Sequence, residues 1–215
     1  MSRPGRRPGP RPSLSRDVVA RAALAEGLDR LSMPGVARRL GVSHAALYTY
    51  VADRDDLVLA AADLAVAEHS WPDPGQEWRP LLESLADALW DLLAAYPGTA
   101  RAVQTMRGAP PGVVGLLHRY AARLVECGFT RRDALVALDF VADLAVATSA
   151  GMAALDGPAG AATRRDAYRA AFAGLPELTD QATLTGRGWL DDKIAIFLDG
   201  LALRRSDRAD TLGRG

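Results

Sequence analysis

Apolar side chains recur every three or four residues along most of this sequence. This spacing matches the turn of an α-helix, about 3.6 residues, whereas a half-buried strand alternates with a period of about two. Short breakers divide the periodic stretches, among them Gly41, Pro97-Gly98 and Asp156-Gly157-Pro158. No run of alternating β-branched residues in the sequence is long enough to predict a strand. The sequence therefore predicts an all-α fold.

Serine and glycine residues mark where the first helices begin and end. Ser15, Ser32 and Ser43 each precede a periodic stretch and predict N-caps, because a serine oxygen accepts a hydrogen bond from a free N–H group of the first turn. Gly41 predicts a helix end, where a left-handed residue is common. We expect helices over about residues 16–30, 33–40, 44–51, 53–70, 78–96, 99–107, 113–127, 130–156, 162–173 and 188–204.

Basic residues are concentrated at the front of the chain. The whole sequence has 26 Lys+Arg and 26 Asp+Glu, so a protein that coats nucleic acid over its entire surface is excluded. Residues 1–54 nevertheless contain ten Arg and four acids, a net charge of +6, and residues 55–215 carry the balancing −6. This division predicts a localised basic surface for a polyanionic partner.

Cysteine content and hydropathy narrow the class of protein further. Cys127 is the single cysteine, so an internal disulfide and a cysteine-based zinc site are excluded, and a reducing cytoplasm is the expected location. The longest apolar run contains Asp139 and Asp143, which argues against a membrane span. The N-terminus has no apolar segment of the kind found in secretory signals. No metal site and no cofactor are predicted.

Two short helices flank the turn Gly41-Val42-Ser43 and form the pattern of a helix-turn-helix. The second helix predicts contacts to base edges in a major groove: His44 to a purine edge, and Ala45 and the Thr49 methyl group to thymine methyls. The side chains expected to reach backbone phosphates, which fix position without reading sequence, are Ser43, Tyr48, Tyr50 and Arg54.

The segment LSMPGVARRLGVSHAALYTYVADRDDL, residues 31–57, resembles the DNA-binding domain of the TetR family of transcriptional repressors. Trp78 with its following leucines, Tyr96-Pro97, and Gly128-Phe129 before a long apolar helix are similar to the regulatory domain of the tetracycline-repressor branch. The resemblance implies a homodimer, held by a four-helix bundle of the helices at 130–156 and 188–204 with their mates. It also implies a small-molecule pocket in the helical regulatory domain.

Two positions depart from the family pattern. Pro34 stands where the family commonly places a base-reading arginine, so we expect Arg7 or Arg11 of the N-terminal arm to contact the minor groove instead. Val103, Gln104 and Thr105 occupy the stretch where a magnesium-tetracycline site needs a histidine. A magnesium-tetracycline complex is therefore not the expected effector.

The sequence predicts four segments: a disordered basic arm over 1–14, a helix-turn-helix domain over 15–52, a helical regulatory and dimerisation domain over 53–205, and a frayed tail over 206–215. Aromatic and methionine side chains of the third segment are core residues by default, and some are expected to line a pocket. The pocket candidates are Trp78, Leu85, Leu89, Met106, Tyr120, Phe140 and Met152.

The functional hypothesis is a ligand-responsive repressor that binds a palindromic operator as a homodimer. Two alternatives stay open: a DNA-binding activator or ligand-blind regulator, and a helical enzyme that uses His118, Asp139 and Cys127. The enzyme ranks far below, because no nucleophile lies at a meaningful spacing from a base, and the sequence shows neither a phosphate-binding glycine loop nor a metal signature.

Overall fold

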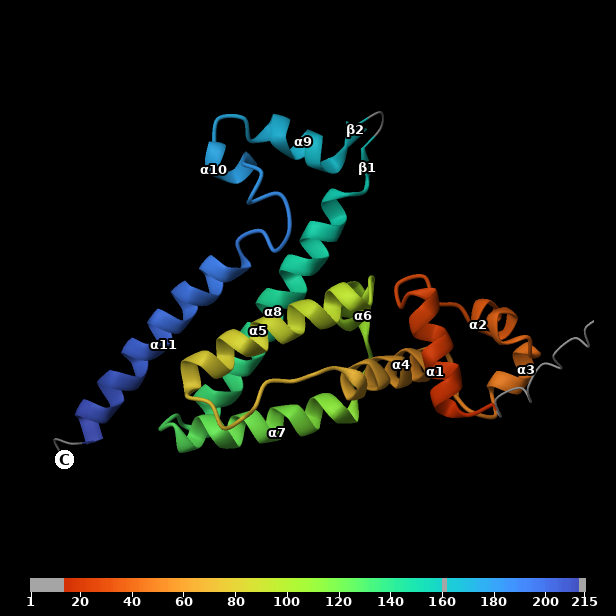
Figure 1. Ribbon diagram of the computed structural model, residues 1–215, viewed down its shortest axis with the longest axis horizontal. Coiled ribbons are helices and arrows are strands. Elements are labelled where there is room, and N and C mark those ends of the chain that lie inside the picture. The colour runs from red at the N-terminus through yellow and green to blue at the C-terminus, as the bar shows by residue number, and fades with distance from the viewer. Residues whose placement is uncertain (1–13, 160–161, 213–215) are drawn as a thin grey trace, which may run out of the picture.

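The computed structural model describes residues 14–159 and 162–212, and it is helical nearly throughout (Figure 1). The predicted arm with Arg7 and Arg11 lies outside the described residues. In chain order the elements are α1 (Arg16–Glu26), α2 (Met33–Leu40), α3 (His44–Leu47), α4 (Arg54–Glu68), α5 (Trp78–Ala95), α6 (Thr99–Thr105), α7 (Pro111–Glu126), α8 (Arg131–Leu155), β1 (Pro158–Ala159), β2 (Ala162–Thr163), α9 (Arg164–Ala171), α10 (Pro176–Thr179) and α11 (Leu190–Leu212).

The all-α prediction is confirmed, and the helix boundaries correct it in several places. Helix α1 ends at Glu26, because Gly27 turns the chain with a φ of 86° and donates its N–H to the Leu24 carbonyl. Helix α3 is shorter than predicted and continues as turns up to Tyr50. Helix α11 runs to Leu212, past the start of the predicted tail at residue 206, and no glycine or proline interrupts residues 206–212. The two-residue antiparallel pair β1–β2 was not expected.

Helices α1 to α3 and the first half of α4 pack into one unit, the N-terminal head, at the right of Figure 1. Its core includes Val19, Val36, Leu47 and Leu57, all at 0% exposure. Small alanines on α1 and α4 let these two helices pack closely. The head core therefore extends beyond residue 53, and α4 belongs to both parts of the molecule.

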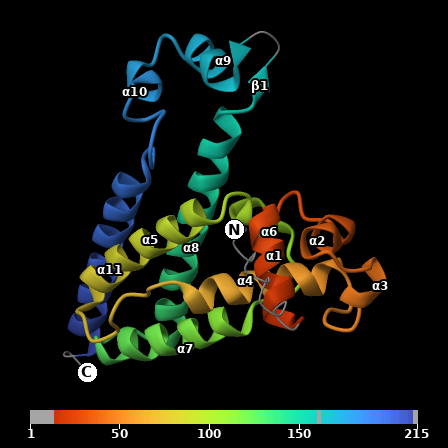
Figure 2. The ribbon, with the colours of Figure 1, turned by 45° about the vertical axis from the view of Figure 1, so that its right-hand side comes forward.

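Helices α5, α7 and α8 form the body of the larger unit, with the second half of α4 leading into it (Figure 2). Its core places Leu81 and Leu82 of α5 against Leu124 of α7 and Leu138 of α8. Asp63 of α4 accepts a hydrogen bond from the Gly112 N–H at 2.7 Å, which fixes α4 to the start of α7. The head is thereby joined to the body through one continuous helix.

Helices α8 and α11 are in contact, and Phe140 of α8 stacks on Phe197 of α11 with ring centroids 4.4 Å apart. Helix α8 is long and apolar enough to cross a membrane by length and composition alone, and 22% of its most apolar window is buried. Much of its apolar surface is therefore uncovered in a single chain. We call the exposed apolar residues of the two helices the α8–α11 face: Val136, Phe140, Ile196 and Leu203.

Candidate nucleic-acid interface

The turn between α2 and α3 is built from local hydrogen bonds that the sequence encodes directly. Ser32 caps α2 by accepting from the Gly35 N–H at 3.2 Å, and Ser43 caps α3 by accepting from the Ala46 N–H at 3.2 Å. Gly41 takes the left-handed conformation, φ 67° and ψ 33°, which favours glycine. The adjacent Val42 N–H donates to the Ala37 carbonyl at 3.1 Å. The predicted caps and the predicted turn are all present.

Helix α3 presents one side to solvent and buries the other. Leu47 is fully buried in the head core, and Val51 after it is 2% exposed. The exposed side, which we call the recognition face, consists of Ser43, His44, Ala45, Tyr48 and Thr49.

Polar groups dominate the recognition face. The Tyr48 side chain is 51% exposed, and the His44 ring meets the Tyr48 ring edge-on with centroids 5.2 Å apart. This contact orients the two side chains jointly and leaves the imidazole nitrogens and the phenol hydroxyl at the surface. The face has the hydrogen-bonding groups and the two methyl groups that a major groove can accept.

Two of the predicted phosphate-contacting residues are partly engaged within the head. The Arg54 Nε donates to the Leu31 carbonyl at 3.0 Å, which anchors the start of α4 to the α1–α2 connection. The Tyr50 ring is half-buried against the head core. Half of the Arg54 side chain is still exposed, and its Nη1 lies 4.0 Å from an Asp55 carboxylate oxygen. Both residues therefore have a structural role that the sequence reading missed.

An ion pair that the sequence did not suggest fixes the segment after α3. Arg16 at the start of α1 donates to the Tyr50 carbonyl at 2.7 Å and to the Asp56 carboxylate at 3.0 Å. Asp56 also accepts from the Ala52 N–H at 2.8 Å. We call Arg16, Asp56 and the backbone groups they hold the Arg16–Asp56 clamp. It ties both ends of the segment between α3 and α4 to α1.

The charges of the clamp reinforce each other. The hydrogen bond from Arg16 is the main cause that lowers the pKa of the Asp56 carboxyl from its ordinary value; partial burial opposes this, and the Ala52 N–H adds to it. The Asp56 partner in turn raises the pKa of the Arg16 guanidinium. The neighbouring Asp53 carboxylate caps α4 by accepting from the Asp56 N–H at 2.8 Å.

Comparison with known proteins identifies the family to which this helix-turn-helix belongs. The family model "Bacterial regulatory proteins, tetR family" matches residues 17–61, which span the head. The class A tetracycline repressor protein from transposon 1721 of Escherichia coli is 31% identical over 207 residues, covering 89% of this chain and 92% of the repressor. The chain belongs to the TetR family. It is therefore a DNA-binding transcriptional regulator, and the helical-enzyme alternative is ruled out.

Solved structures of TetR family proteins share the fold over most of the chain. The Streptomyces coelicolor TetR family protein ActR in complex with actinorhodin has a TM-score of 0.71 at 25% identity, covering 88% of this chain and 96% of ActR. A possible TetR family transcriptional regulator from Streptomyces coelicolor A3(2) has a TM-score of 0.74 at 27% identity, covering 88% and 99%. A shorter match links the chain to the repressor DrrR1 of Streptomyces coeruleorubidus, 31% identical over 142 residues, which cover 62% of this chain and 53% of DrrR1.

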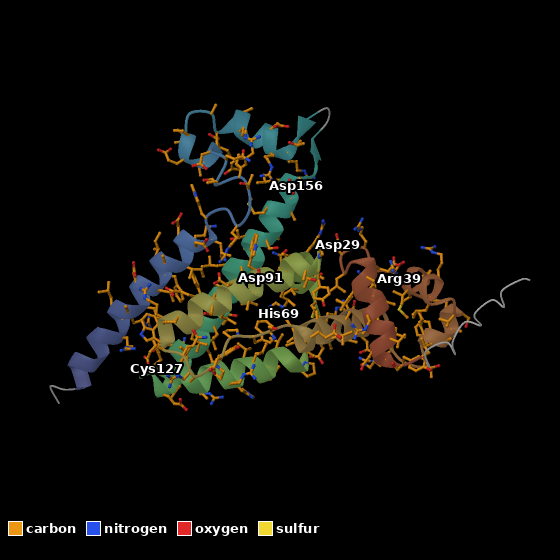
Figure 3. The ribbon with its side chains drawn as sticks, viewed as in Figure 1. Asp29, Arg39, His69, Asp91, Cys127 and Asp156 are labelled. Carbon is orange, nitrogen blue, oxygen red and sulfur yellow. The ribbon has the colours of Figure 1, made fainter. Side chains whose placement is uncertain are left out.

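The larger unit of this TetR family chain contains an open cavity of about 740 Å³ between α5, α6, α8 and the start of α9. Trp90 and Leu93 of α5, Arg101 of α6 and Met152 of α8 contribute to its walls. Asp29, which belongs to the head, also lines the cavity and lies beside α6 (Figure 3). The volume is in the range of sites for small organic ligands.

Of the seven predicted pocket candidates, Met152 lines this cavity and the other six do not. Leu85 and Tyr120 are buried in the body core, where the Tyr120 hydroxyl donates to the Pro72 carbonyl at 2.9 Å. Desolvation by that burial raises the pKa of the Tyr120 phenol. Leu89 borders two hydrophobic clusters of the body. These three residues contribute to the packing between helices.

The remaining candidates lie in three different places. Trp78 meets Phe129 edge-on with centroids 5.5 Å apart, and Phe140 belongs to the α8–α11 face. Met106 packs against the head core and lines a smaller cavity of about 110 Å³. The sequence showed that these side chains are apolar and large, but their grouping depends on how the helices cross.

His69 and His118 lie in different surroundings. Over residues 14–159 and 162–212, no group of three His, Cys, Asp or Glu side chains is placed to hold a metal ion. His69 packs edge-on against Trp71, whereas His118 lies in a shallow groove on the outside of α7.

Proposed function

We propose that this TetR family regulator is a repressor that binds a palindromic operator as a homodimer and leaves it when a small-molecule effector binds. The exposed recognition face carries the proposal, because it combines base-reading and phosphate-contacting groups on one rigid turn. In a symmetric dimer the two recognition helices must lie about 34 Å apart to enter successive major grooves. The tetracycline repressor and DrrR1, two of the matched relatives, are named as repressors, which supports repression over activation.

Base contacts are assigned to His44, Ala45 and Thr49, and phosphate contacts to Ser43, Tyr48, Tyr50 and Arg54. For the last two, the terminal nitrogens of Arg54 and the Tyr50 hydroxyl are the groups proposed to reach DNA, since the rest of each side chain is engaged in the head. Arg7 or Arg11 of the arm is proposed to reach the minor groove. Deleting residues 1–13 is then expected to reduce the salt dependence of DNA binding. An unchanged salt slope would remove the arm from the interface.

The proposed dimer forms through the α8–α11 face of both chains. Ile196 is 74% and Leu203 69% exposed, values that are unusual for large aliphatic side chains adjoining an apolar groove. Packing two copies of this face would bury the uncovered apolar surface of α8 in a four-helix arrangement. The operator-bound protein is accordingly expected to act in the cytoplasm, where the DNA is, and not in a membrane.

The effector is proposed to bind in the cavity between α5, α6, α8 and α9. Arg101 lines this cavity and also the smaller one, whose wall includes Arg54 and Asp55 at the start of α4. Helix α6 thus lies between the effector cavity and the helix that carries the head. To release the operator, the ligand must bind the arrangement that does not bind DNA more tightly than the one that does. The difference in binding free energy must be several kcal/mol, about 5.5 kcal/mol for a complete switch. A ligand that binds both arrangements equally tightly does not shift the equilibrium between them.

Selection of bound duplexes from a random pool tests the proposal. A repressor of this kind should enrich sites with two-fold symmetry and half-sites about one helical turn apart. Recovery of sequences without symmetry, or no enrichment at moderate salt, would overturn it. Reporter assays with the selected site placed downstream and upstream of a promoter then distinguish the repressor from an activator.

A further inference from the structure

The charges around the effector cavity differ in sign from those of the region that contains it. Residues 55–215 hold sixteen Lys+Arg and twenty-two acids. The cavity is nevertheless lined by three arginines, Arg101, Arg164 and Arg165, and by two carboxylates, Asp29 and Asp156. An acidic region therefore encloses a cavity with a small excess of positive charge.

The ion pair among these groups leaves the positive charges of two arginines uncompensated. Asp156, at the end of α8 (Figure 3), forms an ion pair with Arg165 at 2.6 Å, so these two charges offset each other. Arg101 and Arg164 make no ion pair with any residue in the described parts of the chain. Arg101 comes from α6 and Arg164 from the first turn of α9, so two unpaired guanidinium groups stand on different walls of the cavity.

Arg165 adds a third donor that is held in place. Its side chain is 17% exposed, and its Nη1 is buried without a hydrogen-bond partner in the described structure. Guanidinium groups bind carboxylates and related anions with paired, charge-assisted hydrogen bonds. An acidic group bound between Arg101 and Arg164 would place oxygen acceptors among donors that now lack them.

Apolar side chains also contribute to the lining. Trp90, Leu93, Pro97 and Met152 contribute an aromatic ring, two aliphatic surfaces and a thioether. An aromatic or fused-ring skeleton fits such a wall, because rings stack on tryptophan and pack well against methionine sulfur. We infer that the effector cavity takes an organic anion, a ring system with an acidic group that Arg101 and Arg164 bind. This inference rests on the proposed effector role of the cavity and adds the chemical class.

Two fluorescent probes with nearly the same ring system test the charge requirement. Anilinonaphthalene sulfonate carries an acidic group, and N-phenylnaphthylamine is its neutral counterpart. Each is titrated into the full-length protein, and the ratio of the two Kd values reports the contribution of the acidic group. Binding to a random apolar patch would change both Kd values together.

Arg101→Gln and Arg164→Gln are each expected to weaken sulfonate binding about tenfold, the range of a charge-assisted hydrogen bond, and to leave the neutral probe unchanged. Arg169→Gln is the matched control, because Arg169 is also on α9 but pairs with Asp166 and does not line the cavity. Asp156→Asn should have the opposite effect and tighten sulfonate binding severalfold, since it releases Arg165 from its ion pair. A merely structural perturbation would not produce that gain.

Trp90→Ala separates the two levels of the proposal and should weaken both probes. If Trp90→Ala weakens both while the arginine variants leave the ratio unchanged, the organic-anion inference is wrong and the cavity remains a ligand site. If Trp90→Ala affects neither probe, or neither probe binds, the cavity is not the site and the inference falls with it. Operator binding by the same variants, measured without probe, reports independently on the DNA-binding part of the proposed function.

Discussion

The head and the α8–α11 pair leave opposite kinds of surface uncovered. The head has its own hydrophobic core. Its exposed recognition face is polar apart from Ala45 and the methyl group of Thr49. The α8–α11 face exposes large aliphatic and aromatic side chains around a groove. A polar surface on a rigid turn suits a hydrated, charged partner, whereas an apolar one calls for a partner that excludes water.

The two surfaces also differ in how they are held. Short-range caps and the Arg16–Asp56 clamp hold the recognition face, and none of them needs a second chain. Within one chain the α8–α11 pair is held by buried residues of the body core, such as Val141 and Leu198, by the Phe140–Phe197 stack and by the ion pair from Arg204 to Asp133 at 3.3 Å. The contacts that hold the recognition face therefore lie within one chain, whereas the apolar residues of the α8–α11 face remain exposed in it.

The strongest test of this contrast places a charge on the α8–α11 face. Ile196→Asp should leave the single chain folded, because this side chain is 74% exposed. In the proposed dimer it would bury two carboxylates near a two-fold axis, at a cost above about 3 kcal/mol, or more than a hundredfold in dimer dissociation. Sedimentation velocity measures the dimer, and operator binding should weaken in parallel.

Val125→Asp is the matched control for the dimer experiment. Val125 is also an exposed apolar residue, at 44%, but it lies on α7 outside the α8–α11 face. The control variant should sediment like the unmodified protein. A dimer that survives Ile196→Asp unchanged would show that the exposed apolar face serves another purpose.

The next largest effect belongs to the recognition face. His44→Ala should relax sequence preference at one base pair of each half-site, where the wild type discriminates by about 1–3 kcal/mol. Affinity for a non-specific duplex should change little, because His44 is not proposed to contact phosphates. Competition binding with single-base variants of the selected operator measures both quantities. An unchanged preference profile would place α3 outside the major groove.

The same contrast explains what could be predicted from the sequence. The turn at Gly41 and the caps at Ser32 and Ser43 depend on neighbours within a few residues, so local patterns were enough to predict them. The Arg16–Asp56 clamp joins residues forty positions apart, and no short motif encodes it. The lining of the proposed effector cavity is still harder to predict from the sequence, because the directions of the Trp90, Arg101 and Met152 side chains depend on how α5, α6 and α8 cross. Size and hydrophobicity alone therefore pointed to residues such as Tyr120, which lies in the body core and not in the walls of this cavity.

The clamp itself gives a prediction that depends on pH. Asp56→Asn removes the charge that Arg16 binds and should lower the free energy of unfolding by about 1–2 kcal/mol at neutral pH, with solvent screening limiting the effect. Because the pKa of Asp56 is lowered on folding, its stabilisation is fully present above the unfolded value of about 3.9 and is lost as pH falls through the folded-state pKa.

Thermal unfolding from neutral to acidic pH checks this prediction. The difference between the wild type and Asp56→Asn should be constant at neutral pH and shrink in the acid range. The Arg16→Met variant should match Asp56→Asn, and the double variant should add little to either. Independent, additive effects would show that the two residues do not act as one clamp.

The smallest expected effect comes from one hydroxyl group of the recognition face. Tyr48→Phe keeps the ring that meets His44 edge-on, so the geometry of α3 should be unchanged. It removes the proposed hydrogen bond to phosphate, which should weaken binding to all duplexes by about 0.5–1.5 kcal/mol, or roughly twofold to tenfold. Tyr168→Phe on α9 is the control and should bind DNA like the wild type. Since a phosphate contact carries no sequence information, the operator and a random duplex must lose affinity by the same factor; a loss confined to the operator would move Tyr48 from the phosphates to the bases.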